Sequence, residues 1–133
     1  MKLSKKELLA MTVHSSLKTY CSMLGYPYAI PRWENISHAD MDFGIMVVDE
    51  VLFQRRIAEL TPADVHQIWV KERMAMGYRL GFKRDRATKV HPNMVPYELL
   101  PPKEQMKSKI VLETIRLFGT IEDHQTMGDV DHG

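Results

Sequence analysis

Apolar residues recur with helical spacing in four separate stretches of the chain. The first stretch begins with Ser4 and Glu7, a capping-box pair in which each side chain satisfies a backbone donor of the other residue. It ends at Gly25, since glycine readily takes the left-handed backbone that closes a helix. The apolar stripe at i, i+3, i+4 and i+7 consists of Leu17, Tyr20, Cys21 and Leu24. The pattern predicts a first helix over residues 4–24.

Two prolines separate this helix from the next one. The segment 26–32, Tyr-Pro-Tyr-Ala-Ile-Pro-Arg, favours an extended connection because proline lacks the backbone donor that a helix needs. Ser37 then provides a cap for a second helix, with Asp40 in its first turn, and Gly44 weakens that helix slightly. The apolar face of the second helix consists of Met41, Ile45, Val48 and Leu52.

The third helix has the clearest start signal in the chain. Thr61 is a capping residue, Pro62 fits the first helical position, and Asp64 adds an acidic group to the first turn. Gly77 closes this helix. One side of it is lined by Val65, Ile68, Trp69, Glu72 and Met76.

Glycine and proline interrupt the chain between residues 77 and 102, which predicts loops with at most two short strands. Short segments such as 81–83 and 95–97 lie within it. A last helix is predicted over residues 102–118, with its end at Gly119. Its apolar residues include Met106, Ile110, Ile115 and Leu117.

These elements predict a compact, mainly α (α+β) fold of about four helices with two short strands. We expect one domain over residues 1–119, with an N-terminal helical part (1–60) and a core part (61–119). Residues 120–133 are acidic and carry few apolar side chains, so we expect a mobile tail there.

The charge balance removes several classes of partner. The chain has 18 Lys and Arg against 17 Asp and Glu, a net charge of +1, so no global field attracts nucleic acid or an anionic membrane. Cys21 is the single cysteine and excludes an internal disulfide, which favours a reducing compartment. The apolar run near the N-terminus is too short for a signal peptide, and no stretch is long enough to span a membrane. We therefore expect Met1 to be the true start of a cytoplasmic protein.

Basic residues nevertheless gather in one place, between Tyr78 and Tyr97, where Asp85 is the one acid. The cations are Arg79, Lys83, Arg84, Arg86 and Lys89. Guanidinium groups bind phosphate in a bidentate fork, and Tyr78, Trp69 or Tyr97 offers a ring on which a purine can stack. Gly77 and Gly81 allow a ligand to approach the backbone closely. Together these residues supply the parts of a nucleotide site, although the spacing matches no P-loop or dinucleotide fingerprint.

A structural explanation competes at most of these positions. A charge run in a loop is commonly a solvated surface, which applies to Lys83, Arg86 and Lys89. Trp69 shares an apolar helical face and Tyr97 is flanked by Pro96, so both fit a packed position. Arg73 and Arg84 could instead form a structural ion pair with Asp85. His91, which precedes Pro92, fits a turn histidine.

Metal binding and catalysis find little support in the sequence. The histidines show no paired ligand spacing, and one cysteine cannot build a thiolate site. Cys21 falls in an apolar stripe, where a buried thiol is inert. The chain also contains no nucleophile elbow. We expect no metal, no cofactor and no enzymatic activity.

The stretch from His66 to Pro101 resembles the RyR domain, the repeat of ryanodine receptors. The matching motifs are His66-Gln67-Ile68-Trp69, Arg73, Gly77-Tyr78-Arg79-Leu80-Gly81, Arg84-Asp85, Lys89, His91-Pro92, Val95-Pro96-Tyr97 and Leu100-Pro101. Tyr78 stands where the family usually has Trp, and Leu80 where it has Tyr. Lys107-Ser108 is similar to the short stand-alone form found in bacteria and their phages.

The resemblance implies a non-enzymatic binding module, because the receptor repeats form a nucleotide site with stacked aromatic residues. We therefore expect recognition or sequestration of a nucleotide-derived small molecule in the cytoplasm of a bacterium or of a phage host. Tandem repeats in the receptor also suggest a homodimer. Two alternatives stay open: an interaction module for a host or phage protein, and, less favoured, nucleic-acid binding through the basic stretch. The expected ligand-binding residues are Tyr78, Arg84, Arg73, Trp69, Lys89, His91, Tyr97 and Arg79.

Overall fold

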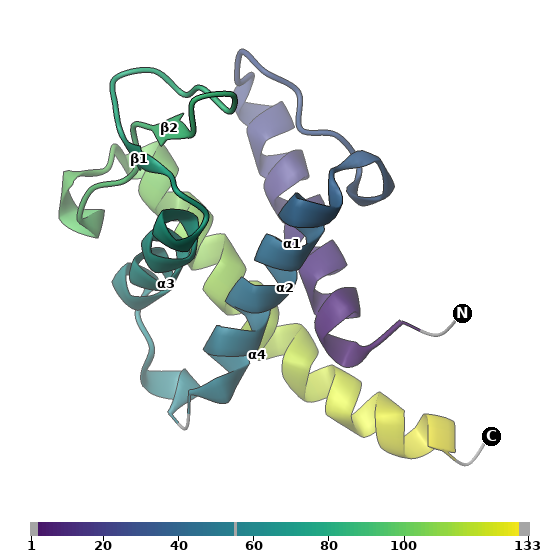
Figure 1. Ribbon diagram of the computed structural model, residues 1–133. Coiled ribbons are helices and arrows are strands. Elements are labelled where there is room, and N and C mark those ends of the chain that lie inside the picture. The colour runs from purple at the N-terminus through teal and green to yellow at the C-terminus, as the bar shows by residue number, and fades with distance from the viewer. Residues whose placement is uncertain (1–2, 55, 131–133) are drawn as a thin grey trace.

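A computed structural model describes residues 3–54 and 56–130, and of residues 120–130 the backbone alone. Over this part of the chain the fold has four α-helices and two very short strands (Figure 1). The helices are α1 (Lys5–Leu24), α2 (His38–Phe53), α3 (Pro62–Ala75) and α4 (Pro102–Val130). Single 3-10 turns are η1 (Trp33–Asn35), η2 (Ile57–Glu59) and η3 (Tyr97–Leu99), and the strands are β1 (Arg79–Leu80) and β2 (Val90–His91). The mainly α fold is as predicted.

The helix starts confirm the capping residues read from the sequence. Ser4 and Glu7 exchange two hydrogen bonds of 3.2 Å, each from a backbone N–H to the other side chain. Thr61 and Asp64 form a second capping box, which closes the first turn of α3. The left-handed backbone of Gly25, with φ of +67°, ends α1 as predicted.

The end of α4 was not predicted correctly. The helix continues past Gly119 to Val130. Gly119 is a packing residue: a Cβ atom there would lie 3.5 Å from Leu52 Cδ2 and 4.0 Å from Leu9 Cδ1. The sequence after it contains no proline, so nothing interrupts the backbone hydrogen bonds. Of the expected mobile tail, residues 131–133 lie outside the described part of the chain.

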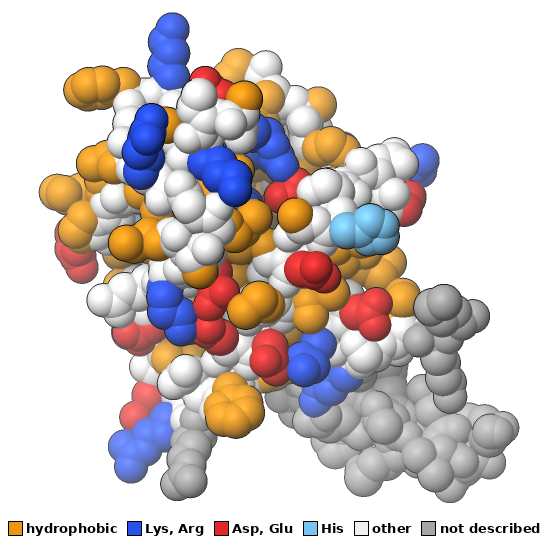
Figure 2. All heavy atoms as spheres, viewed as in Figure 1, with side chains coloured by type: hydrophobic (Ala, Val, Ile, Leu, Met, Phe, Trp, Pro, Cys, Tyr) orange, Lys and Arg blue, Asp and Glu red, His pale blue; other side chains and the backbone are white. Residues whose placement is uncertain are grey.

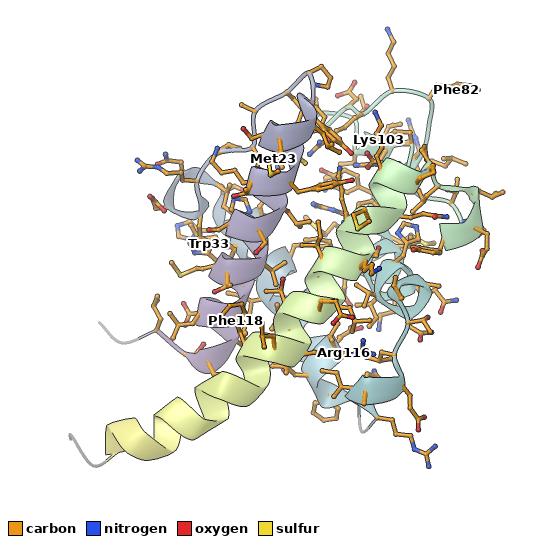
Figure 3. The ribbon with its side chains drawn as sticks, turned by 180° about the vertical axis from the view of Figure 1, so that it is seen from behind. Met23, Trp33, Phe82, Lys103, Arg116 and Phe118 are labelled. Carbon is orange, nitrogen blue, oxygen red and sulfur yellow. The ribbon has the colours of Figure 1, made fainter. Side chains whose placement is uncertain are left out.

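The core lies where α1 and α4 run side by side, with α2 and α3 packed against them (Figures 1 and 3). Its buried residues are Leu9, Ala10, Val13, Val48, Val51, Val65, Val111, Leu112 and Ile115. The predicted faces were partly wrong, because Leu24, Met106 and Leu117 are exposed. The first half of α1 contributes Leu9, Ala10 and Val13 to the core, while in its second half Cys21 is buried and Leu17 packs against the core. Periodicity identifies a helix, but the neighbouring helices decide which turns of it are covered.

The segment after α3 folds back on itself through two parallel strands. Arg79 pairs with Val90 and Leu80 with His91, which confirms the predicted upper limit of two strands. Asp85 and Val90 also exchange two backbone hydrogen bonds of 2.9 Å. Within the described residues, no helix is long and apolar enough to cross a membrane. We call the loop between the strands, residues 81–89, the basic loop.

Candidate functional site

Arg73, on the last turn of α3, lies at the centre of an aromatic cluster beneath the basic loop. The Cζ atom of its guanidinium is 3.7 Å from the ring centre of Phe43, 5.0 Å from that of Tyr78 and 5.8 Å from that of Trp69. Burial lowers the pKa of Arg73, and the charge of Asp40 opposes this shift. Among the described residues, the buried Nε of Arg73 has no hydrogen-bond partner. The guanidinium of Arg73 is therefore stabilised mainly by cation–π contacts with the surrounding rings.

Asp40, in the first turn of α2, is the carboxylate partner of this region. It pairs with Arg73 at 3.8 Å and forms a short contact with Arg86 of the basic loop. The predicted ion pair of Arg73 and Arg84 with Asp85 is therefore wrong. Asp85 instead accepts hydrogen bonds from the backbone N–H groups of Ala87 and Thr88, at 3.0 and 3.3 Å. Its side chain closes the turn and leaves the surface of the loop to the cations.

A row of rings continues from Trp69 toward the surface. Trp69 stacks on His66 at 5.5 Å and meets the edge of His91 at 5.0 Å, while His66 also lies 6.2 Å from the Tyr97 ring. His66 is buried and its Nε2 lies 2.7 Å from the carbonyl oxygen of Val95. The row therefore packs η3 and β2 onto α3. Trp69, His91 and Tyr97 are all half-buried, as the packing alternative for Trp69 and Tyr97 predicts.

His91 is a neutral histidine in a basic environment. Burial lowers its pKa to about 4, and the charges of Arg84, Arg73 and Lys107 act in the same direction. Its Nδ1 accepts a hydrogen bond of 3.0 Å from the backbone N–H of Asn93. A neutral ring that accepts at Nδ1 carries its proton on Nε2, so His91 offers a donor there.

The basic loop carries its cations on the outside. Lys83, Arg84, Arg86 and Lys89 are all exposed, as is Arg79 on the neighbouring strand β1. Figure 2 shows Lys and Arg side chains over the end of the molecule that bears β1 and β2, where few acidic side chains are visible. Phe82 is fully exposed among them and lies at the same end as Lys103 (Figure 3).

Two of the predicted ligand residues stand apart from the cluster. The ammonium group of Lys89 donates a 2.8 Å hydrogen bond to the carbonyl oxygen of Met76, which caps the end of α3. Lys89 itself has a φ of +56°, and its side chain runs beside Gly77, whose φ is +92°. Arg79 is exposed on β1. The structure thus brings together Tyr78, Arg73, Trp69, His91 and Tyr97, with Arg84 close enough to His91 to lower its pKa.

Sequence reasoning missed a second cluster, built from the connection between α1 and α2 and from the first turns of α4. The carboxylate of Glu104 accepts hydrogen bonds from the Tyr26 hydroxyl, from Asn93 at 2.7 Å and from Lys107 at 2.9 Å. Burial alone would raise the pKa of Glu104, but these hydrogen bonds lower it. The Lys107 ammonium lies 4.5 Å from the centre of the Tyr26 ring. The two tyrosines on either side of Pro27, Tyr26 and Tyr28, were the one sequence signal for this cluster.

Two pockets on the surface of the described residues are lined by none of the predicted ligand residues. The first has a volume of about 250 Å³ and lies at the end of α1. The second, of about 400 Å³, is lined by Gln54, Leu60, Asp64, Gln67, Ile68 and Lys71. Within the described part of the chain, no three acidic, histidine or cysteine side chains group as metal ligands. Cys21 is buried, and burial raises the pKa of its thiol.

A comparison with known families identifies a match to the RyR domain. The family model of the RyR domain matches residues 49–124, which is more than half of the chain. The match includes the end of α2, α3, both strands, the basic loop and most of α4. It leaves out α1 and the connection that carries Tyr26.

Proposed function

Because the chain belongs to the RyR domain family, we propose that it is a small, non-enzymatic binding module for a nucleotide-derived small molecule. An adenine nucleotide, an ADP-ribose-type compound or a cyclic nucleotide would be recognised or sequestered in the cytoplasm of a bacterium or of a phage host. The resemblance of Lys107-Ser108 to the short prokaryotic form supports that setting.

One observation carries the proposal: cations in the basic loop and beneath it lie beside aromatic rings. The guanidinium of Arg84 lies 4.6 Å from the centre of the Tyr28 ring, and that of Arg73 lies 5.0 Å from the Tyr78 ring. Phosphate groups need cations, and nucleobases need flat apolar faces. Asp85 does not compete for these cations, because its carboxylate is occupied by the turn.

A thermal-shift screen with ATP, ADP, AMP, ADP-ribose, cyclic ADP-ribose and cyclic di- and oligonucleotides tests the proposal. A ligand present at 100 times its dissociation constant adds about 2.7 kcal/mol to the apparent stability. We expect a selective shift with one compound that is reduced in Tyr78→Ala and in Arg84→Ala. Lys6→Ala is the charge-matched control, since Lys6 pairs with Asp49 near the start of α1. Equal shifts in all three variants would contradict the site, and no shift with any compound would contradict the function.

A second candidate function rests on Phe82. A fully exposed phenylalanine is unusual, and here it projects from a loop of exposed cations. These features fit a protein partner with an acidic surface and an apolar pocket. A purified partner that binds with defined stoichiometry to the native protein, and not to Phe82→Ser, would support this function; equal binding of the two would contradict it.

A further inference from the structure

The pocket at the end of α1 is formed by the part of the chain that the family match leaves out. Its volume is about 250 Å³. Its lining residues come from the last turns of α1 and from the connection that follows. They are Lys18, Cys21, Ser22, Tyr26, Pro27, Tyr28, Ala29 and Ile30.

The walls of this pocket are held in place by hydrogen bonds to α1 and to α4. The ammonium group of Lys18 donates a 2.7 Å hydrogen bond to the carbonyl oxygen of Ile30, which ties the connection back to α1. The hydroxyl groups of Tyr20 and Tyr26 reach α4, the first at 2.8 Å from the carbonyl oxygen of Lys103 and the second at the Glu104 carboxylate. The pocket is therefore formed before any ligand arrives, which reduces the entropy cost of binding.

Cations of the family segment meet the wall of the pocket at Tyr28. The Arg84 guanidinium lies over the Tyr28 ring, and the Lys107 ammonium lies 3.5 Å from the Tyr28 hydroxyl. Both charges also lower the pKa of Cys21, against the larger effect of burial, so their field reaches the interior wall. Glu104 pairs with Lys107, and its carboxylate also accepts hydrogen bonds from Tyr26 and Asn93.

We infer that the pocket of Tyr26 and Tyr28 receives the base of the nucleotide, while Arg84 and Lys107 bind its phosphate groups. The inference rests on the proposed function and deepens it by assigning the base to the N-terminal connection. Tyr78 then contributes through its contact with Arg73, whose guanidinium lies 5.0 Å from the centre of its ring. A volume of about 250 Å³ lies just below the range of roughly 300–1,000 Å³ that is typical of pockets for whole ligands. It therefore suits one part of a nucleotide, with the charged part outside against the cations.

Photo-labelling of the full chain with 8-azido-ATP tests the position of the base directly. Trypsin cleaves after Lys18 and Arg32, so a label in the pocket appears on the segment 19–32. A label next to Tyr78 appears on the segment 74–79, between Arg73 and Arg79. We expect the label on 19–32, and we expect an excess of ATP to prevent it. A protected label on 74–79, or on any other segment, would overturn the inference.

Substitutions at Tyr28 give an independent measurement. Tyr28→Ala is expected to weaken ATP binding at least tenfold by calorimetry, whereas Tyr28→Phe keeps the ring and retains most of the affinity. Unchanged binding in Tyr28→Ala, with normal binding by the native chain, overturns the subsite and leaves the proposed function intact. If 8-azido-ATP gives no ATP-protected label, this inference fails, while the proposed function is judged by the thermal-shift screen.

Discussion

The guanidinium of Arg73 lies 3.7 Å from the centre of the Phe43 ring, and this contact joins α3 to α2 beneath the basic loop. The side chain of Arg73 is only 13% exposed and that of its partner Asp40 is 16% exposed. Arg86 shares the same carboxylate but is 56% exposed. The two arginines thus bind one acid from environments of very different dielectric.

Arg73→Ala is expected to lower the free energy of unfolding by about 2–4 kcal/mol, because it removes the contact with Phe43 and a largely buried ion pair. Arg86→Ala is the matched control and should cost less than about 1 kcal/mol, since an exposed pair contributes little. Urea unfolding measures both values. Equal losses in the two variants would show that the aromatic cluster does not stabilise the fold.

His91 should weaken the fold in acid. Burial and the charges of Arg84, Arg73 and Lys107 lower its pKa to about 4, from an ordinary value of 6.5. The unfolded chain therefore binds a proton before the folded chain does. The stabilising contribution is complete above pH 6.5 and is lost as the pH falls from there through about 4.

An NMR titration of the His91 ring checks this prediction, and we expect no inflection between pH 5 and 8. Arg84→Ala should raise the pKa of His91, because one repelling charge is removed. Lys6→Ala should leave it unchanged. A native His91 that titrates near 6.5 would contradict the placement of these cations around it.

The carboxyl groups of Glu72 and Glu50 shift each other's pKa in opposite directions, which predicts a second pH effect. The hydrogen bond between the two carboxyl groups, followed by burial and the charge of Glu50, raises the pKa of Glu72. The same hydrogen bond, together with Lys71 at 2.8 Å, lowers the pKa of Glu50 although burial opposes this. The contribution of Glu72 is complete below its unfolded pKa and is lost as the pH rises through the folded one. That of Glu50 is lost as the pH falls through its lowered pKa.

Glu72→Gln keeps a donor for Glu50 without a titrating proton. We expect its Tm to rise relative to that of the native protein as the pH increases from 5 to 8. Thermal unfolding at intervals of half a pH unit measures the difference. Two parallel curves would mean that the two carboxyl groups do not shift each other's pKa.

Gly81→Ala should disrupt the base of the basic loop. A Cβ atom at this position would lie 2.1 Å from Val90 Cγ1, much closer than van der Waals contact. We expect a loss of about 1–3 kcal/mol, as is typical of overpacking. Adding Val90→Ala should restore part of this loss, because the nearest remaining atom, Val90 Cβ, is 3.5 Å away. A double variant that is no more stable than Gly81→Ala would contradict this explanation.

The features predicted best from the sequence were those set by contacts between residues close together in the chain, such as the helix starts. Ser4 and Thr61 act on backbone groups three residues away, so their helix starts could be recognised without knowledge of the fold. Gly119 was misread because its reason, contact with Leu52, lies in another helix. Within the candidate site, the contact of Tyr26 with Glu104 spans 78 residues, and no periodicity or motif announces such a pair. The basic residues of the loop could be recognised in the sequence because they stand close together, but their contact partners Asp40 and Tyr28 could not.

The pairing of α1 with α4 has a consequence during synthesis on the ribosome. Leu9 and Val13 form the core together with Leu112 and Ile115, which are made roughly a hundred residues later. At about 5–20 residues per second, that delay is on the order of 5–20 s. Throughout this interval the apolar face of the first helix can pack against α2 but not against α4, which covers the rest of it in the native fold. The core of the nascent chain is therefore completed only when the last helix has been synthesised.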